Sequence, residues 1–85
     1  MALFEIWLEK SSDMKYIACF ESVLPEKGKD KFVGTPVDSP YIAVNMIRQE
    51  IRKVMGANDQ IRIRSRIKIY DNYSVNDALE DLARG

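Results

Sequence analysis

The chain has 85 residues, equal numbers of cationic and anionic side chains, no histidine and one cysteine, Cys19. This length predicts a single domain over residues 1–85 with a modest hydrophobic core. The missing histidine removes the usual general base and the usual metal ligand, so the composition argues against catalysis and against a metal or other cofactor. A lone cysteine closes no intramolecular disulfide, and no run of about eighteen apolar residues is present. We therefore expect a cytoplasmic, non-enzymatic protein that does not enter a membrane.

The zero net charge hides a segregation of charge along the chain. Residues 48–70 contain seven cations and two anions, whereas residues 1–47 and 71–85 each contain an excess of anions. This asymmetry predicts a localised surface that binds an anionic partner.

The first 23 residues predict two strands. Residues 2–9 alternate between apolar and mostly polar side chains, which is typical of a strand with one buried face. A short polar turn leads to residues 14–23, which predict a second strand paired antiparallel with the first. One face of this hairpin is apolar and is expected to pack on helices: Phe4, Ile6, Leu8, Tyr16, Ala18 and Phe20. The other face carries Trp7, Ile17 and Cys19, and we expect it to remain uncovered.

Residues 24–39 form a long connection with two prolines and a charged middle. A loop of this length in a small domain is usually functional or disordered, so we expect it to be mobile. Its second half contains Phe32, Val33 and Val37, which are suited to attach it to the sheet.

Two amphipathic helices are expected. The first begins at Ser39-Pro40, with Ser39 as the N-cap and Pro40 in the first turn. Its apolar residues recur at three- and four-residue steps and predict a buried stripe: Tyr41, Val44, Ile47, Ile51 and Val54. Gly56 predicts a left-handed cap. The second helix begins at Ser74, and its apolar face consists of Val75, Ala78, Leu79 and Leu82.

Residues 61–69 alternate strictly between apolar or small and cationic side chains, which predicts a third strand with one buried face. We expect Ile63 and Ile67 to be fully buried against the helices. The opposite face presents four cations and an aromatic residue at regular steps: Arg62, Arg64, Arg66, Lys68 and Tyr70. The predicted architecture is therefore α+β, in the order β-β-α-β-α, with a three-stranded, antiparallel-rich sheet and two helices on one face.

The line of cations predicts a surface that binds RNA or single-stranded nucleic acid. Arginine presents a planar fork that matches phosphate, and Tyr70 can stack on a base. Further cations near the end of the first helix would extend this surface: Arg48, Arg52 and Lys53.

Two other interpretations remain open. Glu5, Glu9 and Glu21 are expected on the same sheet face, so the arginines can instead pair with these carboxylates. The uncovered apolar side chains on that face predict a protein interface: Trp7, Ile17 and Cys19. Such an interface would serve a homodimer, or an interaction or inhibitor module such as a phage-type counter-defence or antitoxin-like protein.

Overall fold

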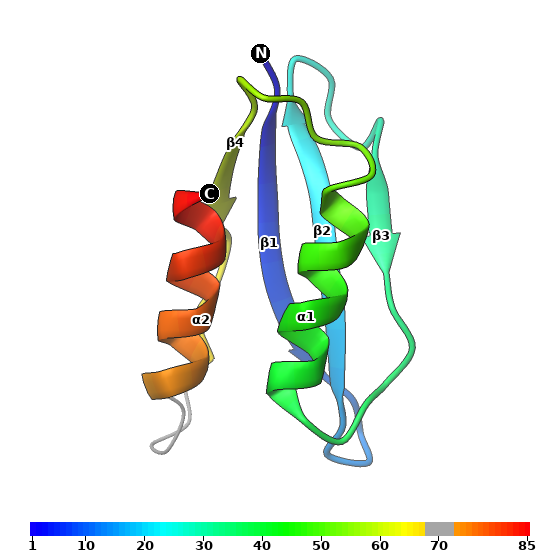
Figure 1. Cartoon of the computed structure of the whole chain (residues 1–85). Coiled ribbons are helices and arrows are strands. Elements are labelled where there is room, and N and C mark those ends of the chain that lie inside the picture. Colours follow the sequence, from blue (N-terminus) through cyan, green and yellow to red (C-terminus); the bar gives the residue numbers. More distant parts are fainter. Residues whose placement is uncertain (68–72) are drawn as a thin grey trace.

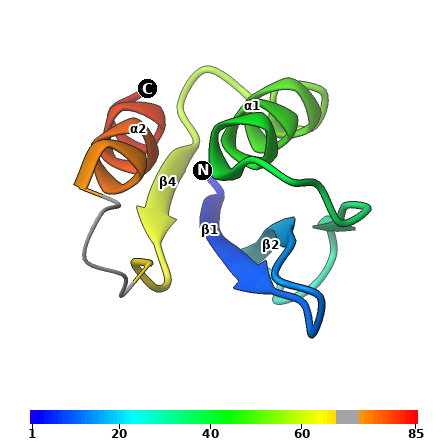
Figure 2. The same cartoon turned by 90° about the horizontal axis from the view of Figure 1, so that it is seen from below.

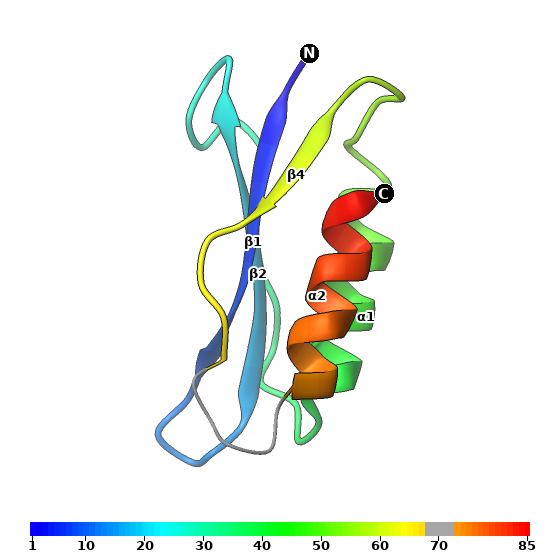
Figure 3. The same ribbon diagram turned by 90° about the vertical axis from the view of Figure 1, so that its left-hand side faces the viewer.

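The structure is a computed structural model that describes residues 1–67 and 73–85. Its elements follow the order β1 (Leu3–Lys10), β2 (Tyr16–Leu24), β3 (Lys31–Val33), α1 (Pro40–Ile51), β4 (Gln60–Ile63) and α2 (Tyr73–Arg84). The strands form one sheet in the order β3-β2-β1-β4 (Figure 1). Both helices lie on the same face of this sheet (Figure 3). The α+β class is confirmed, but the sheet has four strands rather than three, and the order is β-β-β-α-β-α.

The sheet is mixed. β1 pairs antiparallel with β2, and β2 pairs antiparallel with β3. β4 pairs parallel with β1, and their register places Phe4 opposite Ile61. Because β3 and β4 lie at opposite edges of the sheet, the chain crosses its face through α1 to reach β4 (Figures 1 and 2). This crossing places α1 over the strands, and α2 lies beside α1 on the same face (Figure 1).

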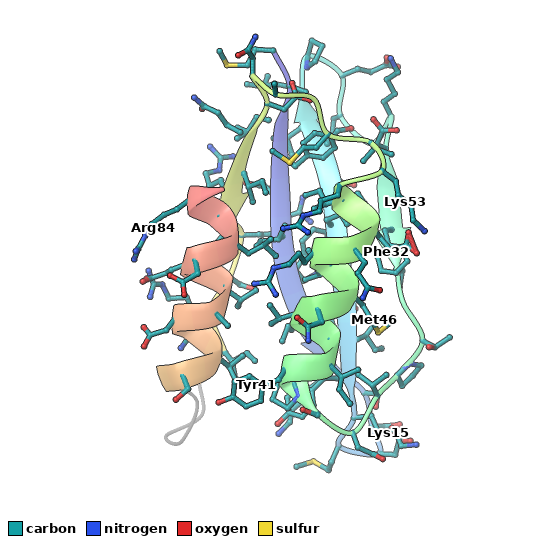
Figure 4. All side chains as sticks on the ribbon, viewed as in Figure 1. Lys15, Phe32, Tyr41, Met46, Lys53 and Arg84 are labelled. Carbon is teal, nitrogen blue, oxygen red and sulfur yellow. The ribbon has the colours of Figure 1, made fainter. Side chains whose placement is uncertain are left out.

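The connection over residues 24–39 is attached to the sheet at two points. β3 places Phe32 opposite Phe20, and the two rings stack with centroids 5.5 Å apart. Val37 then forms an isolated bridge with Tyr16. Figure 4 shows Phe32 near Met46 on the side of α1 that faces β3, and both side chains pack against the core. The attachment expected for this half of the connection is confirmed.

The core lies between the sheet and the two helices. Its fully or nearly fully buried side chains come from β1, β2, α1 and α2: Phe4, Ile6, Ala18, Phe20, Ala43, Val44, Ile47, Ile51, Val75, Leu79 and Leu82. The predicted apolar faces of the hairpin and of α2 are therefore largely confirmed. Tyr41 and Val54 are exposed, so their assignment to the buried stripe was wrong. α1 ends at Ile51, which leaves Val54 in the turn that follows.

The helix caps agree with the sequence at one end of α1 only. Ser39 Oγ accepts a hydrogen bond from the Tyr41 N–H at 3.2 Å, which confirms the N-cap. The C-cap is Arg52, and Gly56 does not adopt a left-handed conformation. Its N–H instead donates to Asp59 Oδ2 at 2.8 Å, so this glycine belongs to the loop before β4.

The strand predicted over residues 61–69 is shorter than expected. β4 ends at Ile63, and the ladder with β1 closes with a hydrogen bond from the Arg64 N–H to the Ile6 carbonyl at 2.9 Å. The following residues leave the sheet on the side away from the helices (Figure 3).

Ile63 and Ile67 are half-buried, so the expectation that both are fully buried was wrong. The backbone of Ile67 is held by α2 rather than by a neighbouring strand. Its N–H donates to Asn76 Oδ1 at 3.1 Å, and Asn76 Nδ2 donates to its carbonyl at 3.2 Å. The side chain of Asn76 thus makes the backbone hydrogen bonds that a neighbouring strand would make if β4 extended to Ile67.

Candidate functional site

The face of the sheet away from the helices carries several of the side chains that the sequence marked as functional. We call it the outer sheet face. Because side chains alternate across a strand, it is formed by the residues between those of the core. They are Leu3, Glu5, Trp7, Glu9, Ile17, Cys19, Glu21, Val23, Lys31, Val33, Gln60, Arg62 and Arg64. Neither helix covers this face (Figure 3).

Arg64 lies at the centre of the outer sheet face. Its Nε donates to Glu5 Oε1 at 2.8 Å, and its Nη2 donates to Glu21 Oε1 at 2.7 Å. The guanidinium carbon lies 3.8 Å from the centroid of the Trp7 ring, so the cation stacks on the indole. One side chain therefore links β4, β1 and β2 across the face.

Glu5 is shared between two arginines. Arg62 donates to Glu5 Oε2 through Nε at 3.0 Å and through Nη2 at 2.5 Å, while Arg64 occupies Oε1. Glu5 and Glu21 are direct cross-strand partners, and two like charges in that arrangement repel. Arg64 lies between the two carboxylates and converts this repulsion into two ion pairs.

These contacts shift the pKa values of the groups involved. Hydrogen bonds from Arg62, and then from Arg64, lower the pKa of Glu5 below its ordinary value. The hydrogen bond from Arg64 lowers the pKa of Glu21. In return, Glu21 and then Glu5 raise the pKa of Arg64. All three side chains are therefore charged at neutral pH, and with Arg62 they form a group of two cations and two anions.

The apolar part of the outer sheet face is less open than expected. Trp7 is only 8% exposed and Cys19 is fully buried, so the expectation that both lie uncovered was wrong, whereas Ile17 is half-buried. Arg64 covers the Trp7 ring, and the indole Nε1 donates to Glu9 Oε1 at 3.0 Å. The alternative in which arginines pair with glutamates thus holds for Glu5 and Glu21, while Glu9 pairs with the indole.

Cys19 is not placed as a nucleophile. Burial, with a smaller effect of the Glu9 carboxylate, raises the pKa of its thiol to about 11. A thiol with so high a pKa is almost entirely protonated at neutral pH and reacts slowly.

The remaining cations of the predicted nucleic-acid surface lie elsewhere. Arg66 pairs with Glu80 of α2, so it does not continue the line formed by Arg62 and Arg64. Lys68 and Tyr70 lie outside the described residues.

The cations near the end of α1 belong to the helix layer, on the other side of the sheet. Arg48 Nη1 donates to Asn45 Oδ1 at 2.8 Å, and Lys53 pairs with Glu50 at 2.8 Å. Figure 4 shows Lys53 beside the end of α1, and Arg52 directly precedes it as the C-cap of this helix. The structure therefore brings Arg62 and Arg64 together and separates them from Arg66 and from the cations near the end of α1.

Two features were missed from the sequence. Val33 is 58% exposed on edge strand β3, where it extends the outer sheet face. A groove of about 320 Å³ also opens between α1, α2 and β4. The sequence does show a first helix with a basic end and a second helix that is mostly acidic. The groove could not be predicted from this, because only the topology places the two helices side by side.

The described part of the chain contains neither a metal-binding cluster of side chains nor a membrane-spanning helix. Residues 1–67 and 73–85 contain no group of three histidine, cysteine or carboxylate side chains placed to hold a metal ion. Within the same residues, no helix has both the length and the apolar character that crossing a membrane requires.

Comparisons with protein families, with curated proteins and with solved structures found no match.

Proposed function

We propose that this chain is a non-enzymatic protein-binding module that docks through its outer sheet face. One observation carries the proposal: both helices cover the same face of the sheet, and the opposite face holds a prearranged arginine–tryptophan centre. Half-buried or exposed apolar side chains surround this centre: Leu3, Ile17, Val23 and Val33. They lie on both sides of the charged row formed by Glu5, Glu21, Lys31 and Arg62. Accessible apolar area flanked by polar groups is typical of a protein interface.

The centre of the face has the properties of a binding hot spot. Arginine and tryptophan are enriched among the residues that dominate binding energy. Arg64 is held by two carboxylates and by the Trp7 ring, so it loses little conformational freedom when a partner binds. Its side chain is still 34% exposed, and that of Arg62 is 59% exposed, so both remain accessible to a partner.

The proposal is tested by comparing variants in an affinity capture from cells that make the protein. Val33→Asp and Ile17→Asp place a charge on the apolar part of the outer sheet face. Gln49→Asp on α1 is the matched control, since residue 49 is exposed in the helix layer. We expect the two sheet variants to lose a captured protein that wild type and Gln49→Asp retain, as read by quantitative mass spectrometry. Capture that is equal for all four proteins would contradict docking through this face.

A second candidate is the binding of RNA or single-stranded nucleic acid. The observation that favours it is the exposure of Arg62 and Arg66, each of which keeps more than half of its side chain accessible beside a single carboxylate partner. An exposed ion pair contributes little to stability, so a phosphate can compete for such an arginine. The nearby carboxylates oppose this candidate, because they repel the phosphate backbone.

The second candidate is tested with a fluorescent single-stranded RNA titrated at two salt concentrations. If Arg62 contacts a phosphate, Arg62→Gln weakens binding and reduces the slope of affinity against salt by about 0.7. The loss is similar for all RNA sequences, because phosphate contacts carry little base information. RNA affinity that is the same for wild type and Arg62→Gln would reject this residue as a phosphate contact.

A further inference from the structure

Among the described residues, β4 has a neighbouring strand on one side only, because it is the last strand in the order β3-β2-β1-β4 (Figure 1). Alternate residues make its bonds to β1: the Gln60 N–H donates to the Ala2 carbonyl and the Arg64 N–H to the Ile6 carbonyl, each at 2.9 Å. In such a parallel ladder, the residues in between direct their N–H and C=O to the opposite side. The two isoleucines of β4 therefore present backbone donors and acceptors at an open edge.

The side chains of β4 make the two sides of this edge different. Gln60 and Arg62 are exposed on the outer sheet face, whereas Ile61 and Ile63 are half-buried and pack against the core on the helix side. A hollow of about 290 Å³ opens on the helix side, where Ile61 and Ala83 of α2 contribute to its lining. Because side chains alternate across a strand, a strand added here would place apolar residues beside the isoleucines and the residues between them beside Arg62.

Arg62 gives this edge a positive charge. Among the described residues, its Nε and Nη2 contact Glu5, which leaves Nη1 for a further carboxylate. The side chain of Arg62 is 59% exposed, whereas that of Glu5 is 14% exposed and is also held by Arg64. A partner that approaches the edge of β4 therefore meets a cation, while the carboxylate beside it is sheltered.

The same charge disfavours a second copy of β4 as the partner. Two copies that pair antiparallel and use both isoleucines of each strand bring Arg62 of one copy directly opposite Arg62 of the partner subunit. Like charges in that position destabilise a strand pair, and opposite charges stabilise it. The edge therefore favours a strand with an acidic residue at this position and an apolar residue on each side of it.

We propose that β4 binds an extended segment of a partner protein in which an acidic residue lies between two apolar residues. The segment adds to the sheet as a fifth, antiparallel strand, so its backbone bonds to Ile61 and Ile63. Its acidic residue then forms a non-hydrogen-bonded pair with Arg62, the kind of pair in which side chains lie closest. The inference does not rest on docking through the outer sheet face, because the backbone at the sheet edge makes the main contacts.

The charge preference is tested with fluorescent synthetic peptides of the sequence Ser-Thr-Val-Glu-Val-Thr-Ser, or with Lys in place of Glu, by fluorescence anisotropy. We expect wild type to bind the Glu peptide about fivefold more tightly than the Lys peptide, because the residue opposite Arg62 changes the sign of its charge. Arg62→Glu should reverse this preference. Lys27→Glu makes the same change of net charge in the loop between β2 and β3, and this matched control should keep the preference of wild type. Circular dichroism establishes that both variants are folded.

The backbone contact is tested with two N-methylated forms of the Glu peptide. Methylation of the N–H groups of both valines, which face β4 in an antiparallel pair, should abolish binding. Methylation of the N–H groups of Glu and of the second Thr, which face away from β4, should leave binding unchanged. Val33→Asp should also leave it unchanged, although this variant is expected to lose the partner of the outer sheet face. Failure of this inference is thus distinguishable from failure of the proposed function.

Hydrogen exchange followed by NMR locates the peptide on the intact chain. Bound Glu peptide should slow the exchange of the Ile61 and Ile63 amides, and it should leave the Arg62 amide, which lies in the ladder with β1, unchanged. No saturable binding at millimolar peptide, equal affinity for the Glu and Lys peptides, or equal effects of the two methylations would overturn the proposal.

Discussion

At the scale of single residues, Arg64 compensates the repulsion between two neighbouring carboxylates on the outer sheet face. Glu5 and Glu21 oppose each other on neighbouring strands, and Arg64 donates to both. Its stacking on Trp7 adds about 0.5–1 kcal/mol, as cation–π contacts at accessible sites do. The position therefore requires a planar cation that can form two hydrogen bonds and stack at the same time.

This role predicts a pH-dependent effect of Arg64→Gln. The pKa values of Glu5 and Glu21 lie below their ordinary value of 4.5 in the folded protein. The stability that these pairs contribute is thus fully present above about pH 4.5 and is lost as the pH falls through the lowered values. We expect Arg64→Gln to lower the melting temperature by a few degrees at pH 7, and the difference from wild type to shrink below pH 4.5. Melts recorded across this range provide the measurement, and a difference that grows in acid would contradict the assignment.

Burial of Cys19 predicts that its thiol is protected in the folded state. Its pKa of about 11 leaves very little thiolate at pH 8. We expect a chromogenic disulfide reagent to label the native protein far more slowly than the urea-unfolded protein. Labelling at the same rate in both states would show that Cys19 is accessible.

At the scale of elements, the sequence predicted where strands and helices occur better than where they end. The hairpin, the N-cap of α1 and the apolar face of α2 follow from local patterns, and the structure confirms them. The end of β4 did not follow, because the alternation of residues 61–69 contains no glycine or proline to interrupt it. The interruption comes from α2, which supplies Asn76 as the partner of Ile67.

The different burial of two isoleucines predicts different costs for the same substitution. Ile47 is fully buried between the layers, so Ile47→Ala should cost about 2–5 kcal/mol of unfolding free energy through cavity formation. Ile67 is half-buried, so Ile67→Ala should cost about 1 kcal/mol. Urea unfolding measures both values. Equal costs would contradict the half-burial of Ile67 and indicate that it is buried as completely as Ile47.

The contact of Asn76 with the Ile67 backbone gives a further prediction. Asn76→Ala removes two hydrogen bonds and should cost about 1–3 kcal/mol. Asp77→Ala on the exposed side of the same helix is the control and should change stability by no more than about 0.5 kcal/mol. If both substitutions have the same small effect in urea unfolding, Asn76 does not hold the segment after β4.

At the scale of the whole molecule, the order of the strands decides which charges meet. The sequence predicted a line of four cations, Arg62, Arg64, Arg66 and Lys68, and it offered Glu5, Glu9 and Glu21 as possible partners. It could not distinguish ligand binding from internal pairing, because that choice depends on the parallel pairing of β4 with β1. The same topology puts Arg48 and Arg52 in the helix layer, on the other side of the sheet from Arg62. A count of charges along the chain contains no information on this separation.

The most direct test of this account compares Arg64→Gln and Arg64→Lys with wild type in two measurements: a denaturant melt, and a titration with fluorescent single-stranded RNA at two salt concentrations. Lysine keeps the charge that a phosphate would recognise, but it lacks the planar fork that joins Glu5 to Glu21 and stacks on Trp7. The account predicts that both variants are less stable than wild type and that RNA affinity is unchanged. Weakened RNA binding by Arg64→Gln, restored by Arg64→Lys and accompanied by an unchanged melt, would contradict it.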